Sequence, residues 1–353
     1  MDARAHEPRG AKPLRLVLSV PPRGRLPLLA LGFVCLAFGV AGGLARLTPL
    51  EVPASAIALH GPLMVSAFLG TVISLERAVA LERLWAYAAP LCAGLGGIAL
   101  LLAFGRVGFG LLAVASALLV TANLAVLARQ ASLETVTLAA GAAAWLAGNV
   151  ALFAGHAAVP WWIAFFALTI GAERLELTRY MRRGSAVQAS FALLAAALIA
   201  TPLFPRAMGV VLALLALWLW RFDLARVTVR GRGLPRYVAV CLLAGYFWLA
   251  VAGVLMAAAT AYDAALHALF VGFVFSMVFG HAPVILPAVL RVSLPYHPVL
   301  YAPLALLHAS LALRAAGMTV PGAWGNAAAI ALFVATAAAL ALDRRQTAAA
   351  RRR

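Results

Sequence analysis

Two histidines lie in one apolar stretch, DAALHALFVGFVFSMVFGHAPVILPAVL, at residues 263–290. In one continuous α-helix, His267 and His281 are separated by about 21 Å along the axis and lie within about 40° of the same face. An imidazole in hydrocarbon costs free energy unless it binds a partner, so ionisable residues inside a membrane span indicate a functional site. The alternative is that each imidazole only donates to a neighbouring backbone carbonyl.

A second apolar stretch, PASAIALHGPLMVSAFLGTVISLER at 53–77, carries His60 and Met64 one helical turn apart. His60 and His267 each lie near the start of their stretch, so the two imidazoles are at similar depth if both helices cross in the same direction. Imidazole is a ligand for haem iron, copper and zinc, and a thioether favours Cu(I) or an axial haem position. We therefore predict His60, His267 and Met64 as cofactor ligands, with His281 and His308 as further metal-binding candidates. The alternative is a set of core side chains that are satisfied separately.

Charged residues lie at the far ends of two apolar stretches. Glu76 and Arg77 end the second stretch, and Glu173 and Arg174 lie near the end of the sixth. Interleaved carboxylates and guanidinium groups are typical of ion pairs at the membrane interface. The functional alternative is a polar site for protons or an ion, in which Glu76, Glu173 and His281 lie at one depth.

The segment after His281, GHAPVILPAVL, contains two prolines. Pro283 and Pro287 each remove a backbone hydrogen bond, so the sequence predicts that the helix kinks or unwinds here. Broken helices at membrane depth are tolerated where they line a cavity and often carry the binding sites of transporters.

The composition places these residues in a membrane protein. The chain has 353 residues, is 65% hydrophobic and only 11% charged, and its mean hydropathy of +0.99 excludes an ordinary soluble domain. The three cysteines lie singly in different apolar stretches, which favours free thiols. We predict an all-α polytopic protein with one domain at 26–342. Its twelve spans fall at 26–45, 53–75, 84–104, 107–128, 132–155, 158–178, 186–204, 207–222, 236–258, 263–290, 298–316 and 322–342.

The distribution of basic residues predicts the orientation. Of the 28 Lys and Arg residues, only Arg46, Arg106, Arg206 and Arg314 fall in the loops on the side opposite the N-terminus. This asymmetry predicts cytoplasmic basic tails at 1–25 and 343–353 in a bacterial inner membrane. The net charge of +17 is then explained by topology and by attraction to anionic lipids at the cytoplasmic face, without nucleic acid.

A weak internal repeat aligns Glu76 with Glu173 and places His281 at the equivalent position of the tenth span. It predicts three four-helix pseudo-repeats, in which spans two, six and ten are equivalent.

The stretches LHGPLMVSAFLGTVISLERAVAL and LHALFVGFVFSMVFGHAP resemble the histidine-bearing second and tenth helices of the NnrS family. Members of that family are polytopic haem- and copper-containing membrane proteins associated with resistance to nitric oxide. The plan of three pseudo-repeats is also similar to the catalytic subunit of haem–copper oxidases. The chain departs from that subunit in having no adjacent His-His pair, no HxH in span ten and no histidine in span six. The NnrS resemblance implies His60 and His267 as haem ligands, with Met64, His281 and His308 as second choices.

These observations lead to two functional hypotheses. The first is a protein that binds haem b, and copper as a further cofactor, between spans two and ten, with a redox or nitric-oxide-related role and a small gaseous or other small-molecule ligand. The second is a secondary transporter whose substrate or proton site is the polar cluster at the ends of spans two, six and ten. A third possibility, a scaffold with purely structural histidines, stays open.

Overall fold

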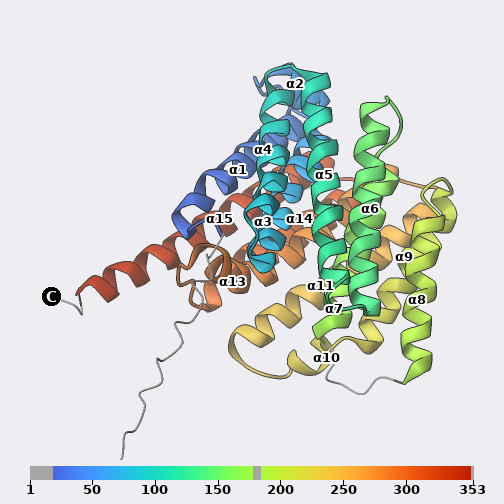
Figure 1. Ribbon diagram of the computed structural model, residues 1–353. Helices are drawn as coiled ribbons and strands as arrows, with labels where there is room; N and C mark the ends of the chain where they lie inside the picture. The colour runs from blue at the N-terminus through green and yellow to red at the C-terminus, as the bar shows by residue number, and fades with distance from the viewer. Residues whose placement is uncertain (1–18, 178–183, 351–353) are drawn as a thin grey trace, which may run out of the picture.

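The computed structural model describes residues 19–177 and 184–350, with side chains described to residue 343. This part of the chain is a bundle of helices and contains no strand (Figure 1). The elements are α1 (Pro22–Ala45), α2 (Ala54–Ala58), η1 (Pro62–Leu69), α3 (Gly70–Leu81), η2 (Leu84–Tyr87), α4 (Ala88–Leu101), α5 (Gly105–Leu127), α6 (Leu133–Phe153), α7 (Val159–Leu177), α8 (Ser185–Ala200), α9 (Pro205–Phe222), α10 (Ala225–Thr228), α11 (Gly233–Ala257), α12 (Tyr262–His267), η3 (Ala268–Phe275), α13 (Ser276–Leu290), η4 (Pro298–Leu300), α14 (Tyr301–Ala315) and α15 (Thr319–Ala350). The all-α prediction is confirmed.

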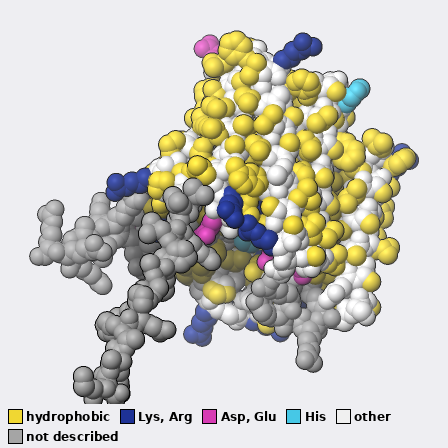
Figure 2. Space-filling model, in the orientation of Figure 1, with side chains coloured by type: hydrophobic (Ala, Val, Ile, Leu, Met, Phe, Trp, Pro, Cys, Tyr) yellow, Lys and Arg dark blue, Asp and Glu magenta, His cyan; other side chains and the backbone are white. Residues whose placement is uncertain are grey.

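Within the described residues, ten helical segments are long and apolar enough to cross a membrane. They expose large apolar side chains that a water-soluble surface would not tolerate in such number, among them Val107 (57%), Leu217 (63%) and Val254 (61%). Figure 2 shows the same property as a broad hydrophobic surface over the face in view. By length and composition, this is the architecture of a multi-pass membrane protein.

Two of the twelve predicted spans do not meet those criteria of length and composition. They correspond to α7, which carries three charged residues near its end, and to α8, which has 16 residues. The predicted C-terminal tail from residue 343 stays a prediction. The helix α15 continues through its first residues to Ala350, because the alanine-rich segment after the last span favours helix. The predicted N-terminal tail lies mostly outside the described residues.

Helix ends follow local sequence signals. Pro22 and Pro205 lie in the first turns of α1 and α9. The backbone N–H groups of a first turn have no partner within the helix, so proline costs no hydrogen bond there. Ser132 and Thr135 form a reciprocal capping box at the start of α6. Glu82 ends α3 and Arg291 ends α13, each in the left-handed conformation. These signals place the turns between apolar segments and so fix the length of each helix.

The second and tenth spans share an irregularity. Each begins as a short α-helix, passes through an eight-residue π-helix and continues as an α-helix: α2, η1 and α3 in the second-span helix, and α12, η3 and α13 in the tenth-span helix. The π-helical segments begin two residues after His60 and one residue after His267. Such segments are uncommon and are found frequently at functional sites.

The structure corrects the prediction of an unwound segment after His281. The helix α13 remains α-helical through Pro283 and Pro287 to Leu290. Prolines are tolerated inside buried membrane helices because neighbouring groups compensate for the missing bond. The irregular backbone of this span lies at η3, nearer its start. The predicted pseudo-repeats stay a prediction: η1 and η3 are π-helical, whereas α7 of the sixth span is α-helical throughout.

A buried ion pair connects α7 to the residue that follows α9, and a hydrogen bond connects the same residue to α11. Arg174 of α7 donates through Nε to Oδ2 of Asp223, just after α9, at 2.7 Å, and both side chains are almost fully buried. The Tyr246 hydroxyl of α11 donates to the same carboxylate oxygen at 3.0 Å, and the backbone N–H of Ala225 donates to Oδ1 at 2.6 Å. The carboxylate thus has a partner on each oxygen.

We predict that Asp223→Ala destabilises the fold strongly, because it leaves the Arg174 guanidinium buried without its counter-ion. Breaking such a pair costs about 3 to 5 kcal/mol. Thermal unfolding of the detergent-solubilised protein checks this, with Glu51→Ala, an exposed acid, as the control. A melting temperature for Asp223→Ala equal to that of the control would contradict the stabilising role of the pair.

Candidate functional site

A cavity of about 360 Å³ lies at the end of the bundle where α1 ends and the second- and tenth-span helices begin. Its walls come from six parts of the chain, which are the end of α1, the starts of both π-containing helices, the start of α7, the end of α14 and the start of α15. The volume is at the lower end of the range of about 300 to 1,000 Å³ that small-molecule and cofactor sites occupy. Three of the predicted ligands, His60, Met64 and His267, line this cavity.

His60 is held by the closely packed end of α1. Its Nδ1 lies 2.6 Å from the carbonyl oxygen of Gly39. A methyl group at Gly43 would lie 2.7 Å from Cε1 of the same imidazole, and one at Gly39 would lie 2.8 Å from Sδ of Met64. Small residues at this spacing let two membrane helices approach closely. The glycines of α1 therefore bring a backbone carbonyl to His60 and leave room for the ring.

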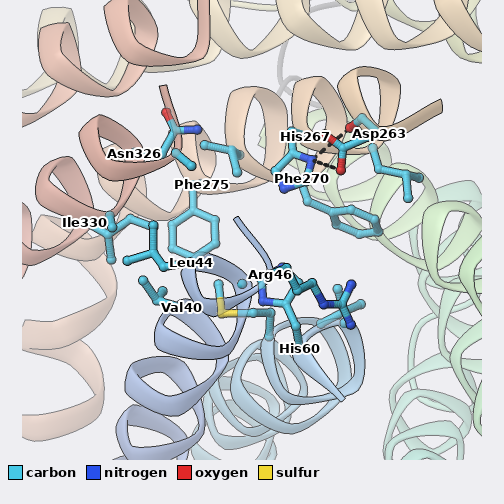
Figure 3. Close-up of a pocket in the computed structure, with 18 of the residues that line it drawn as sticks. Val40, Leu44, Arg46, His60, Asp263, His267, Phe270, Phe275, Asn326 and Ile330 are labelled. Atoms are coloured by element: carbon cyan, nitrogen blue, oxygen red, sulfur yellow. Dashed lines mark hydrogen bonds and ion pairs between the residues drawn. The ribbon is translucent and has the colours of Figure 1, made fainter. Parts of the chain in front are cut away.

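His267 is held by its own helix. Its Nδ1 lies 2.8 Å from the carbonyl oxygen of Asp263, one turn earlier, and 3.3 Å from Oδ1 of the same residue. Arg314 of α14 in turn donates through Nη2 to Oδ2 of Asp263 at 2.9 Å. Figure 3 shows His267 and Asp263 together on one side of the cavity, with His60 on another. Arg314 thus holds Asp263, and Asp263 in turn fixes the orientation of the His267 imidazole.

The two histidines present the same nitrogen for binding. A carbonyl oxygen can only accept, so Nδ1 is the donor in both rings and the neutral imidazole has its lone pair on Nε2. Neither Nε2 atom has a hydrogen-bond partner in the described part of the chain. Metal-binding histidines almost always donate their other ring N–H to a carboxylate or a backbone carbonyl. No group of three or more His, Cys, Asp and Glu side chains among the described residues could hold a metal ion.

The remaining walls are largely apolar and aromatic. Phe275 of η3 stacks on Phe68 of η1 at 6.1 Å between ring centroids, so the two π-helical segments are in direct contact. Trp162 of α7 donates through Nε1 to Oδ1 of Asn149 at 3.1 Å, and Ser66 donates to the same oxygen at 2.8 Å. These buried bonds hold the Trp162 ring in the wall and leave an apolar surface toward the cavity.

Sequence reasoning did not identify three polar groups that line the cavity: Arg46, Arg314 and Asn326. Arg46 donates through Nε and Nη2 to the carbonyls of Ile57 and Ala58 at 2.8 and 3.0 Å. The sequence did set the two arginines apart. Arg46 and Arg314 are two of the four basic residues that the predicted topology leaves on the side away from the N-terminus. Asn326 carried no such signal.

His281 and His308 do not line the cavity. His281 has Nδ1 2.8 Å from the carbonyl oxygen of Met277, and its Nε2 lies 3.5 Å from Nη1 of Arg174. His308 accepts at Nδ1 from Nε1 of Trp248 at 2.9 Å, and its Nε2 lies 3.5 Å from Oγ of Ser276. Both nitrogens of each ring face a protein partner, and the assignment of these two histidines as metal ligands stays a prediction.

A second polar cluster lies at the ends of α3 and α7, around the Arg174–Asp223 pair. The carboxylates of Glu76 and Glu173 are close enough to interact electrostatically, and Arg77 and Arg174 lie beside them. The contact of Arg174 with His281 joins the tenth-span helix to this cluster. The polar site predicted at the ends of spans two, six and ten stays a prediction, and these interactions are the observations that support it. Asp223 and Tyr246 belong to it as well, and sequence reasoning missed both.

A family described as "Domain of unknown function (DUF8744)" matches residues 25–342. The chain belongs to the DUF8744 family. Its matched range covers both the cavity and the polar cluster of this DUF8744 protein. No curated protein and no solved structure matches it. The resemblance to NnrS in the second and tenth spans stays a prediction.

We predict that Gly43→Ala destabilises the protein by about 1 to 3 kcal/mol, because the added methyl group would overlap the His60 ring. Gly61→Ala is the matched control, since a methyl group there meets nothing within 4 Å. Because alanine favours helix over glycine, the control should be neutral or stabilising by less than about 1 kcal/mol. Equal melting temperatures for the two variants would contradict the close approach of α1 to His60.

Proposed function

We propose that this DUF8744 protein binds haem b in the cavity between the second- and tenth-span helices, with a redox or nitric-oxide-related role. The observation that carries the proposal is the pair His60 and His267, which line one cavity from two different helices with their Nε2 atoms free. Imidazole nitrogens are the commonest protein ligands of haem iron. In this proposal the chain crosses a bacterial inner membrane twelve times, with both termini cytoplasmic.

The residues of the cavity fit such a group. Two imidazoles are held by second partners, and the walls contain Phe275, Trp162 and aliphatic side chains that would exclude water from a macrocycle. Bound haem would supply one-electron chemistry or the binding of a small gaseous ligand. The protein's part is to hold the two imidazoles in one tautomer and to keep the site apolar. Met64 is the further ligand in the copper-binding version of the proposal.

The test is a reduced-minus-oxidised visible spectrum of the purified protein, with metal analysis of the same sample. We expect a haem band and about one iron per chain, because His60 and His267 would hold one haem between them. The band should be lost or strongly changed in His60→Ala and in His267→Ala. His156→Ala is the matched control, since His156 is exposed and does not line the cavity.

Free imidazole added to His60→Ala should restore the wild-type spectrum if the protein is folded and only the ligand is missing. Copper without iron would move the assignment to His60, His267 and Met64 as copper ligands. A spectrum without haem, in protein free of metal and expressed with an ample haem supply, would rule out the haem proposal.

The polar cluster supports a second candidate, a secondary transporter. Glu76 and Glu173 bring two like charges together, and such pairs bind a proton or a cation in preference to remaining doubly charged. The Arg174–Asp223–Tyr246 network and His281 are the adjoining polar groups. In this candidate the cluster couples proton movement to the passage of a substrate.

For the transporter, we predict a colourless protein that carries protons across reconstituted vesicles under an imposed pH gradient. Proton entry, followed with a trapped pH-sensitive dye, should fall about tenfold in Glu173→Gln, because the amide cannot release a proton. Glu51→Gln, at an exposed position, should match the wild type. Equal entry in wild type, Glu173→Gln and empty vesicles would argue against this candidate.

A further inference from the structure

Two buried polar groups in the cavity wall have no protein partner. Nε of Arg314 and Nδ2 of Asn326 are both buried without a hydrogen bond in the described part of the chain. The Arg314 side chain is 9% exposed and Asn326 is 6% exposed. Buried donors in native proteins are almost always satisfied, and here two side chains that line one cavity each carry a donor that the described part of the chain leaves unsatisfied.

The contact of Arg314 with Asp263 determines which of its N–H groups can bind a ligand. Its Nη2 donates to Asp263, which holds the planar guanidinium against α12. An arginine N–H can only donate, and its charge is permanent. The unpaired Nε therefore requires an oxygen acceptor, and a negatively charged one forms the strongest bond.

Asn326 provides a neutral donor on another wall. Its Oδ1 accepts from the Ser310 hydroxyl at 2.6 Å, which holds the amide and leaves Nδ2 unpaired. Figure 3 shows Asn326 on the side of the cavity that also carries Phe275 and Ile330, away from Arg46. The donors thus come from α14 and α15, whereas the histidines come from the second- and tenth-span helices.

The charge balance of the cavity points to the same kind of ligand. Arg46 and Arg314 are the two permanent cations in the lining, and Asp263 is the acid there. Asp263 is already paired with Arg314, and no carboxylate among the described residues pairs with Arg46, whose printed bonds go to backbone carbonyls. A ligand with negative charge would bring the site close to neutrality.

We propose that the cavity holds its ligand by carboxylate groups, with Arg314 and Asn326 as the donors inside and Arg46 at the rim. This inference rests on the proposed function, in which the carboxylates are the two propionates of haem b. The imidazoles then bind the iron, and the arginines and Asn326 set the orientation of the ring in the cavity. The preference for a charged over an uncharged macrocycle follows from these three side chains.

The test compares haem b with its dimethyl ester, in which both carboxylates are blocked while the ring and the iron are unchanged. Purified full-length protein made without haem supply is titrated with each compound in the same detergent, and binding is followed by the visible spectrum. We expect wild-type protein to bind haem b about tenfold or more tightly than the ester, the effect of losing a charge-assisted hydrogen bond. Arg314→Gln and Asn326→Leu should each reduce this preference, while Arg106→Gln, outside the cavity, should keep it.

Failure of the inference and failure of the proposed function give different results. Equal affinity of the wild type for both compounds would overturn carboxylate recognition and leave the histidine ligands in place. An unchanged preference in both Arg314→Gln and Asn326→Leu would overturn the role of these donors. If the wild type binds neither compound, the haem proposal and this inference both fail. Thermal unfolding of each variant identifies any loss that comes from misfolding, and the two variants alter different helices.

Discussion

The hydrogen bond between His60 Nδ1 and the carbonyl of Gly39 is the interaction on which the candidate site depends. It selects the ring tautomer, orients Nε2 and is possible only because α1 approaches the second-span helix at glycines. A carbonyl inside an α-helix already accepts a backbone bond, so the imidazole uses the remaining lone pair of Gly39. A side chain at Gly43 would move the ring, and with it one wall of the cavity.

The π-helical segments have a related consequence. An α-helix repeats every 3.6 residues, and a wider turn shifts the direction of every side chain that follows it. In both the second- and tenth-span helices this shift comes directly after the histidine. Residues before and within the π-helical segments line the cavity, and Phe68 and Phe275, within those segments, form the contact between the two helices. The same span can therefore present a histidine near one end and charged groups near the other.

The two polar sites differ in how their charges are satisfied. In the cluster around Asp223, both oxygens of the Asp223 carboxylate accept hydrogen bonds from the protein, and Arg174 neutralises its charge. In the cavity, Arg314 Nε and Asn326 Nδ2 lack partners and the imidazole Nε2 atoms are free. The first arrangement stabilises the fold, and the second leaves binding capacity for a ligand. For this reason we assign the main proposal to the cavity and the second candidate to the cluster.

The sequence alone determined the helical spans, because hydropathy over about 20 residues is a local property that the bilayer enforces on each segment separately. It also predicted that His60, Met64 and His267 lie at one end and that Glu76, Glu173 and His281 gather at another depth, since position along a span fixes depth. Only the tertiary structure decided which faces meet. It added Arg46, Arg314 and Asn326 to the cavity and Asp223 and Tyr246 to the cluster, and it separated His308 from both. These contacts join residues far apart in the chain, and the rotation of each helix about its axis, set by packing and by the π-helical turns, has no local signature in an apolar sequence.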